Sequence, residues 1–235
     1  ILSTEIGASS GGGTPLDQIL TGNNLSDLSF FVNGLDTRTA GIDFVANYRG
    51  LKLGENALNV NLAGNYTLQN ERIGDVKNPA IVSSAGQSVA NQTQEALFFT
   101  SRPQYKVILG LGTDIGKLGV SLNNTVFGPT TFYQQGLDAG IFTEFSTKVV
   151  TDLAFNYGIS DKTTFSLNIN NLLNVLPEWE FKSETSGDSR LQDSEFLMEQ
   201  SNLITFNQRY SQMTYDGYHF SQLGTMLSAA LNVRF

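Results

Sequence analysis

The sequence predicts an all-β fold, an antiparallel transmembrane β-barrel with short turns at one end of its strands and long loops at the other. Segment after segment alternates apolar residues with polar or small ones, as strands with two different faces do. No apolar run approaches the roughly 20 residues that a membrane-spanning helix needs. Very short connections also alternate with very long ones, which is typical of outer-membrane barrels.

The last segment shows the alternation most clearly. From Leu223 to Phe235 every second residue is apolar or Thr, and the residues between them are mostly polar or small. Similar alternation occurs at 42–49, 58–69, 105–111, 118–126, 149–157 and 165–170. We therefore expect seven strands from about Leu28 onward, preceded by a short strand at Ile1–Glu5.

The connections between these strands are of two kinds. Those at 54–56, 114–117 and 160–162 are short, and those at 71–100, 129–147 and 174–218 are long and polar. If Phe235 lies at the periplasmic side, all three short turns fall on that side too. Because the segment at Ile1–Glu5 is too short to cross a membrane, we expect residues 1–235 to be a single domain, the C-terminal part of a larger barrel. Its strands then pair with strands outside this chain.

Composition narrows the function classes. The net charge of −8 disfavours nucleic acid as a partner, since phosphate binding needs a basic surface. Only 15% of residues are charged, and there is no Cys, which excludes disulfides and thiolate metal sites. With a single His, the chain also offers little for transition-metal ligation. We expect no catalytic residues, no metal site and no cofactor.

Four motifs, in this order, resemble the C-terminal part of a TonB-dependent outer-membrane receptor. The first is Phe30–Asn33 followed by Asp36–Asp43, which is similar to the family's entry into a barrel strand. Arg102-Pro103 opens a descending strand, and Thr164–Asn174 is close to the family's asparagine- and leucine-rich segment. The chain then closes on Val233-Arg234-Phe235, so the resemblance spans essentially all of it.

The resemblance implies roughly the last eight strands of a barrel of about 22, with a plug in its lumen. It implies a location in the outer membrane of a Gram-negative bacterium. The activity would be energy-coupled import of a scarce nutrient (a metal chelate, vitamin, glycan or peptide). The implied partners are outer-membrane lipid and lipopolysaccharide, the remainder of the barrel and its plug, and that nutrient. A TonB-type inner-membrane transducer would act through an N-terminal part not in this chain, and a surface lipoprotein is a further candidate.

Aromatic residues of the long loops are the candidate ligand contacts, because loops on a rigid scaffold often carry binding residues. We select Tyr133, Trp179, Tyr210 and Tyr215. The alternative is an aromatic belt at the level of the lipid headgroups, which applies above all to Trp179, the only tryptophan.

A row of amides is predicted to face the barrel lumen, where uncharged polar groups can hydrogen-bond to a plug or to water. Phe235 resembles the terminal aromatic that the outer-membrane assembly machinery recognises, and it also suits a lipid-facing anchor. The amide row consists of Asn47, Asn59, Asn61, Asn65, Asn123, Asn156 and Asn168.

The third long loop is acidic, with seven acids between Glu178 and Glu199 against Lys182 and Arg190. Such a segment could bind a divalent cation, since oxygen ligands suit hard cations. The alternative is a solvated, self-repelling loop that ambient cations bridge to lipopolysaccharide.

Two rival functions remain open. One is a self-contained, small eight-stranded barrel with a structural or adhesion role, which needs residues 1–7 to supply a full strand. The other is an outer-membrane lipolytic enzyme, for which His219 and Ser221 would share one strand face. No orienting third group for that pair can be identified from the sequence.

Overall fold

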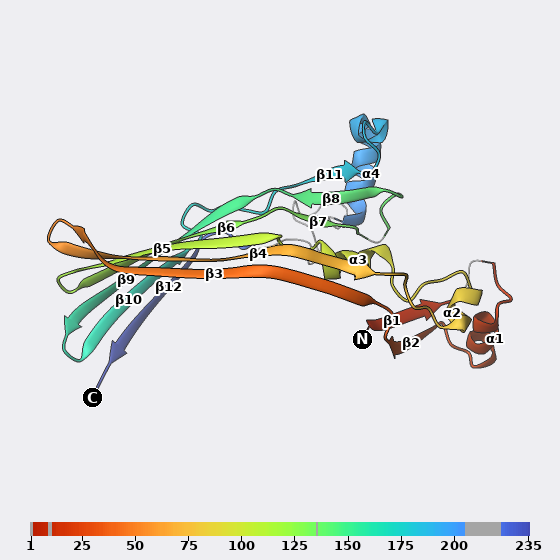
Figure 1. The fold of residues 1–235 in the computed structure, drawn as a ribbon, viewed down its shortest axis with the longest axis horizontal. Coiled ribbons are helices and arrows are strands. Elements are labelled where there is room, and N and C mark those ends of the chain that lie inside the picture. Colours follow the sequence, from red (N-terminus) through yellow and green to blue (C-terminus); the bar gives the residue numbers. More distant parts are fainter. Residues whose placement is uncertain (1, 9–10, 135, 205–221) are drawn as a thin grey trace.

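The seven predicted strands form one antiparallel sheet, called here the long sheet, in which each strand pairs with its neighbours along the chain (Figure 1). The computed structural model describes residues 2–8, 11–134, 136–204 and 222–235. The strands, in spatial order, are β3 (Asp36–Leu53), β4 (Asn56–Ile73), β5 (Tyr105–Ile115), β6 (Leu118–Phe127), β9 (Lys148–Ser160), β10 (Thr163–Asn170) and β12 (Met226–Val233).

This sheet confirms the antiparallel all-β prediction, but the described residues do not close it into a barrel. Within them, β3 pairs only with β4 and β12 pairs only with β10, so both edge strands have one open side. No helix in the described ranges is long and apolar enough to cross a membrane.

The three short turns lie together at one end of the long sheet (Figure 1). They connect β3 to β4, β5 to β6 and β9 to β10, and Gly54 and Gly116 adopt the left-handed conformation that such tight turns require. The C-terminus lies at the same end, because the backbone N–H of Arg234 donates to the carbonyl of Lys162 at 2.8 Å. The predicted one-sided arrangement of short turns is therefore confirmed.

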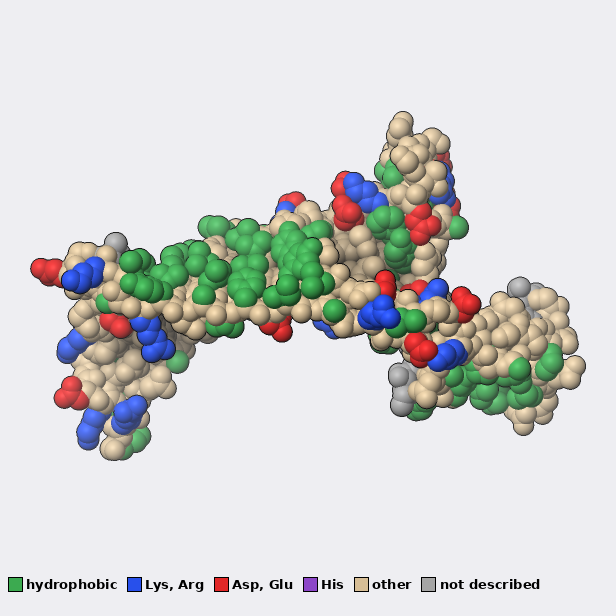
Figure 2. Space-filling model, viewed as in Figure 1, with side chains coloured by type: hydrophobic (Ala, Val, Ile, Leu, Met, Phe, Trp, Pro, Cys, Tyr) green, Lys and Arg blue, Asp and Glu red, His purple; other side chains and the backbone are tan. Residues whose placement is uncertain are grey.

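The register places most of the large apolar residues of all seven strands on one face. Leu62 of β4, for example, lies between Ala46 of β3 and Leu109 of β5. The neighbouring Asn61 lies between Asn47 and Gly110 on the opposite face. Figure 2 shows the result as a band of hydrophobic side chains along the long sheet, with charged side chains gathered towards its two ends.

The long connections fold into secondary structure at the opposite end of the long sheet. A three-stranded sheet of β7 (Thr130–Phe132), β8 (Ile141–Phe145) and β11 (Trp179–Ser183) lies there with the helices α3 (Gln92–Phe99) and α4 (Ser194–Ile204) (Figure 1). A short 3-10 helix, η1 (Ser189–Gln192), precedes α4. We call this unit the cap. Its core consists of Ala96, Phe132, Phe145 and Ile204.

The N-terminal part folds separately and corrects two predictions. The segment predicted as a short barrel strand at Ile1–Glu5 is β1 (Leu2–Gly7), which pairs with β2 (Asp27–Val32) and not with the long sheet. The strand expected from about Leu28 is therefore divided, and the part that belongs to the long sheet begins only at Asp36.

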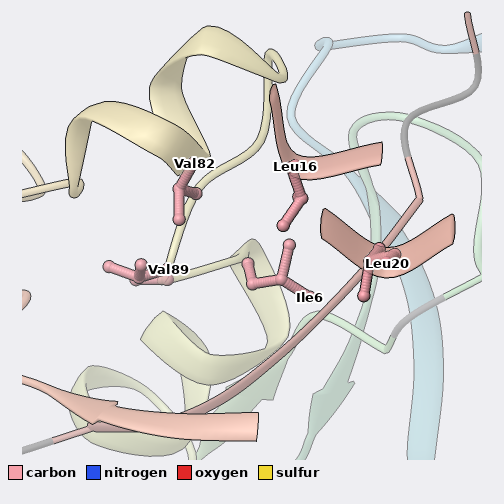
Figure 3. Packing of buried hydrophobic residues seen from close by; sticks show 6 residues of the cluster. Ile6, Leu16, Leu20, Val82 and Val89 are labelled. Carbon is pink, nitrogen blue, oxygen red and sulfur yellow. The ribbon is translucent and has the colours of Figure 1, made fainter. Parts of the chain in front are cut away.

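Local packing explains why β1 and β2 pair with each other and do not join the long sheet. The helices α1 (Pro15–Gly22) and α2 (Ala80–Ser84) cover them, and hydrophobic side chains from these elements point towards one another (Figure 3). Leu28, Phe30 and Val32 of β2 pack against the same core. The core residues are Ile6, Leu16, Leu20, Val82, Val89 and Ala90.

The last strand is shorter than the predicted 222–235 because the chain before it is held in a turn. Gly224 has φ +70°, and a Cβ there would lie 2.3 Å from Oδ1 of Asn174. That same oxygen accepts from the backbone N–H of Thr225 at 3.1 Å. Regular pairing with β10 therefore begins at Met226.

Asn171 follows the last residue of β10 and forms hydrogen bonds to several neighbouring segments. Its backbone N–H donates to Asp152 at 2.8 Å, and its carbonyl accepts from the hydroxyl of Thr225 at 2.7 Å. Its side-chain amide bonds both the carbonyl and the N–H of Val175, at 2.7 and 2.8 Å. The asparagine-rich segment thus joins β9, β10 and β12 where the third long connection begins.

We expect Asn171→Ala to destabilise the protein by about 1–3 kcal/mol, because it leaves the N–H and carbonyl of the half-buried Val175 without their side-chain partner. The φ of +53° at this position adds a cost for Ala. Equilibrium urea denaturation measures the change. Asn168→Ala on the same strand loses one 3.4 Å bond to Ser228 and serves as the control, with an expected change within about 0.5 kcal/mol. Equal effects of the two substitutions would contradict the account.

Candidate functional site

The amides predicted to face a lumen all lie on the polar face of the long sheet. Asn61 donates to Asn47, Asn156 accepts from Ser166 at 2.7 Å, and Asn168 donates to Ser228 at 3.4 Å. Each bond joins two adjacent strands, so part of the amide row stabilises the sheet itself. The register places the whole row on one face, and the lumen that this face would line remains a prediction.

The polar face is hollowed between β3 and β6. A recess of about 410 Å³ lies there, and its side-chain lining is almost entirely uncharged. Gly110 keeps it open, because a Cβ at this position would come within 2.8 Å of Oδ1 of Asn123. The lining includes Asn47, Arg49, Asn59, Asn61, Ser121 and Asn123. Such a surface offers many hydrogen-bond donors and acceptors but almost no net charge.

Two of the four candidate ligand-binding aromatics lie in the cap. Both Tyr133 and Trp179 are half-buried and pack against its core. The ring of Tyr133 lies 5.0 Å from that of Phe142, and Trp179 meets the ring of Phe181 edge-on at 5.3 Å. These contacts place Trp179 in the cap rather than on the apolar face of the long sheet.

Burial in the cap raises the pKa of Tyr133 above its usual value, and Glu184, which the phenol approaches, adds to the rise. The phenol is therefore a neutral donor at physiological pH. The other candidates, Tyr210 and Tyr215, lie outside the described residues, as do His219 and Ser221 of the rival lipolytic reading.

The acidic segment is folded, and three of its seven acids form ion pairs. Asp188 accepts from the guanidinium of Arg190 at 2.7 Å and from the hydroxyl of Ser183 at 2.7 Å. The hydrogen bonds from Arg190, followed by that from Ser183, hold the pKa of Asp188 well below its usual range. Glu178 pairs with Lys148 in the same way, and Glu180 pairs with Lys182.

These pairs bear on the two interpretations of the acidic segment. The part of the chain that the structure describes contains no group of three His, Cys, Asp or Glu residues placed to hold a metal ion. The segment up to Ile204 is also not a loose, self-repelling loop, because β11, η1 and α4 lie within it. Arg190, which also reaches Asp138 at 3.5 Å, connects the two halves of the cap.

Phe235 lies two residues beyond the end of β12, and its side chain is fully exposed. By alternation it shares the side of Val233 and Leu231, which is the apolar face. This position is compatible with a lipid-facing anchor and with the predicted assembly signal.

Comparisons of the chain with protein-family models, with curated proteins and with solved structures found no match. The resemblance to TonB-dependent receptors therefore stays a prediction.

Sequence reasoning missed the residues that shape the cap. The Asp188–Arg190 pair was counted only as part of an acidic run, although two residues of opposite charge at this spacing can fold back on each other in a turn. The sequence pattern singles out Arg102 only as the start of a descending strand, and it does not single out Glu144. Both line a recess described below.

Asp188 should make the cap sensitive to acid. Its pKa is lowered in the folded cap, so its contribution to stability is complete above the ordinary value of about 4 and is lost as the pH falls below it. Trp179, the only tryptophan, reports on the cap by fluorescence. We expect the wild type to show a red shift only well below pH 4, as the pH approaches the lowered pKa, and Asp188→Asn to show a red shift already at pH 7.

Asp161→Asn, in the turn between β9 and β10 at the far end of the long sheet, is the matched control and should behave as the wild type does. Wild-type fluorescence of Asp188→Asn at pH 7 would show that the carboxylate does not hold the cap together.

Proposed function

We propose that the long sheet is part of the wall of an outer-membrane β-barrel and that the protein is a TonB-dependent receptor that imports a scarce nutrient. One observation carries the proposal. All seven strands contribute to a continuous apolar face, and no other described element of the chain covers it. Among the buried hydrophobic residues of the described chain, only Val150 belongs to the long sheet.

The exposed surface supports a partner for this face. The accessible surface is 14,716 Å², whereas a compact monomer of 25.6 kDa exposes about 10,400 Å². Each large apolar side chain that stays in water loses about 1.5–3 kcal/mol of the stabilisation that burial would give. Over a face of seven strands, the sum exceeds the roughly 5–15 kcal/mol by which domains are stable. The face therefore needs an apolar environment.

The height of the apolar face suits a bilayer. On β4 it runs from Leu58 to Leu68, which is about 34 Å along the strand at roughly 3.4 Å per residue. At a tilt of about 40° this length spans about 26 Å, close to the apolar band of about 25 Å on outer-membrane barrels. The opposite, polar face would then line the lumen.

Strand direction favours a larger barrel over a self-contained one. Seven strands that alternate in direction leave β3 and β12 running the same way, so they cannot pair antiparallel with each other. Closure requires an odd number of further strands. β1 is a poor eighth strand, because it has six residues and is already paired with β2. Two copies inserted in the same orientation cannot close a barrel either, because β12 of one copy and β3 of the other run the same way.

The proposal includes the partners that the resemblance implies. Lipid and lipopolysaccharide surround the apolar face, the remainder of the barrel pairs with both edges, and a plug contacts the amide-lined polar face. A TonB-type transducer supplies energy through the plug, a surface lipoprotein can cover the cap end, and no covalent chemistry is involved.

A charge on the apolar face tests the membrane assignment. We expect Leu62→Arg to cost about 2–4 kcal/mol and to prevent assembly in the outer membrane. Asn61→Arg, one residue away on the polar face, is the matched control and should assemble. Membrane fractionation and heat-modifiable gel migration measure the outcome. Equal tolerance of both changes would remove the basis for a membrane wall.

Transport is tested separately in cells. Solutes taken from the medium are compared between cells with and without the gene, each with and without a protonophore. The proposal predicts at least one solute whose uptake needs both the gene and the proton gradient. Assembly in the outer membrane without any such solute would leave a barrel wall and exclude energy-coupled import.

A further inference from the structure

A second recess, of about 280 Å³, lies where the long sheet meets the cap, and we call it the seam recess. Its walls come from the C-terminal part of β4, from the segments just before β5 and just after β6, and from β8 of the cap (Figure 1). It is lined by Thr67, Asn70, Phe99, Thr100, Arg102, Pro103, Gln104, Pro129, Thr130, Thr131 and Glu144.

Hydrogen bonds between its walls fix the shape of the seam recess. The amide of Asn70 donates to the carbonyl of Phe98 at 2.9 Å, and the hydroxyl of Thr100 donates to the carbonyl of Thr131 at 2.8 Å. The backbone N–H of Thr67 donates to the carbonyl of Gln104 at 2.7 Å. An ion pair between Arg72 and Glu95 also joins β4 to α3.

Other polar groups in the same lining remain available. Among the described residues, the guanidinium of Arg102 has no hydrogen-bond or ion-pair partner. The half-buried carboxylate of Glu144 accepts no hydrogen bond there, although its charge helps to raise the pKa of Lys182. Gln104 uses its amide nitrogen on the carbonyl of Thr67 at 3.2 Å, which leaves its amide oxygen to accept.

We propose that the seam recess binds a neutral saccharide unit. Arg102 supplies donors, Glu144 and Gln104 supply acceptors, and the opposite charges of Arg102 and Glu144 cancel. A sugar hydroxyl both donates and accepts, so one ligand can satisfy both kinds of group. Phe99, Pro103 and Pro129 offer apolar surface for the faces of the ring. The volume lies just below the range of about 300–1,000 Å³ that is usual for small-molecule sites.

A zwitterion such as a free amino acid fits the same two charges less well. Arg102 is exposed, and an ion pair in water contributes little, because screening and side-chain entropy offset it. Such a ligand would also leave the hydroxyls and the apolar faces unused.

This inference rests on the proposed function in one respect only, namely the side of the membrane that the seam recess faces. The seam recess lies at the end opposite the short turns, which the proposal assigns to the cell exterior (Figure 1). A saccharide at that side could come from free oligosaccharides or from the sugars of lipopolysaccharide.

The test uses the protein purified in detergent. Binding of a panel of neutral gluco-, manno- and galacto-oligosaccharides is measured by calorimetry, with purified lipopolysaccharide and free glycine as separate arms. We expect binding to at least one oligosaccharide, weakened at least tenfold by Arg102→Gln and by Glu144→Gln. Arg38→Gln and Glu55→Gln, which lie outside the seam recess, are the matched controls and should bind as the wild type does.

Each arm decides one point. Binding of lipopolysaccharide alone, sensitive to the same two substitutions, would identify a lipid-linked sugar as the source. Binding of glycine alone, or of no saccharide, would overturn the inference, as would equal effects of the recess and control variants. Saccharide binding without energy-dependent uptake would leave the seam recess standing and refute the transport proposal. Uptake of another solute without saccharide binding would do the reverse.

Discussion

The apolar face of the long sheet is the constraint on which the rest of the structure depends. Each strand alternates, and the meander pairing adds the apolar residues of neighbouring strands into one surface. Because no element in the described ranges forms a second layer over this surface, we infer that lipid or another protein covers it. The strand directions, the position of the turns and the charge-free middle of the band are all compatible with lipid.

The parts of the chain that do bury hydrophobic side chains lie beyond one end of that sheet. The cap and the N-terminal part each have a small core of their own, and hydrogen bonds through Asn171 and Asn70 tie the long connections to the strand ends. Within the described chain, the long connections are therefore largely folded and have defined surfaces. Recesses between such surfaces and a rigid sheet can present fixed polar groups to a ligand, which is the basis of the seam recess.

Local pattern was sufficient for the long sheet because its strands pair with their neighbours in sequence. Alternation over ten residues, as at 58–69, identified the strand, and turns such as that at Gly54 set its partner. The prediction was wrong where a tertiary contact overrode the pattern. Gly224 and Asn174 delay the start of β12, and the core around Ile6 and Leu16 holds β2 away from the long sheet.

The helices of the long connections were not predictable from sequence in the same way. α2 has five residues and α3 buries only Ala96, so neither shows a helical apolar stripe. The contacts that matter there also join residues far apart, as Thr100 with Thr131 and Asp138 with Arg190 do. The amide row could be placed on one face from spacing alone, whereas the walls around Arg102 and Glu144 could not.

The most direct test of the account is the environment of successive residues along β4. The chain has no Cys, so single cysteines from Leu58 to Gln69 can each carry a fluorescent label in membranes that contain brominated lipid. The account predicts quenching that alternates, strong at Leu58, Val60, Leu62 and Tyr66 and weak at Asn59, Asn61 and Asn65. Quenching without alternation, or none at any position, would contradict a membrane wall with one face in lipid.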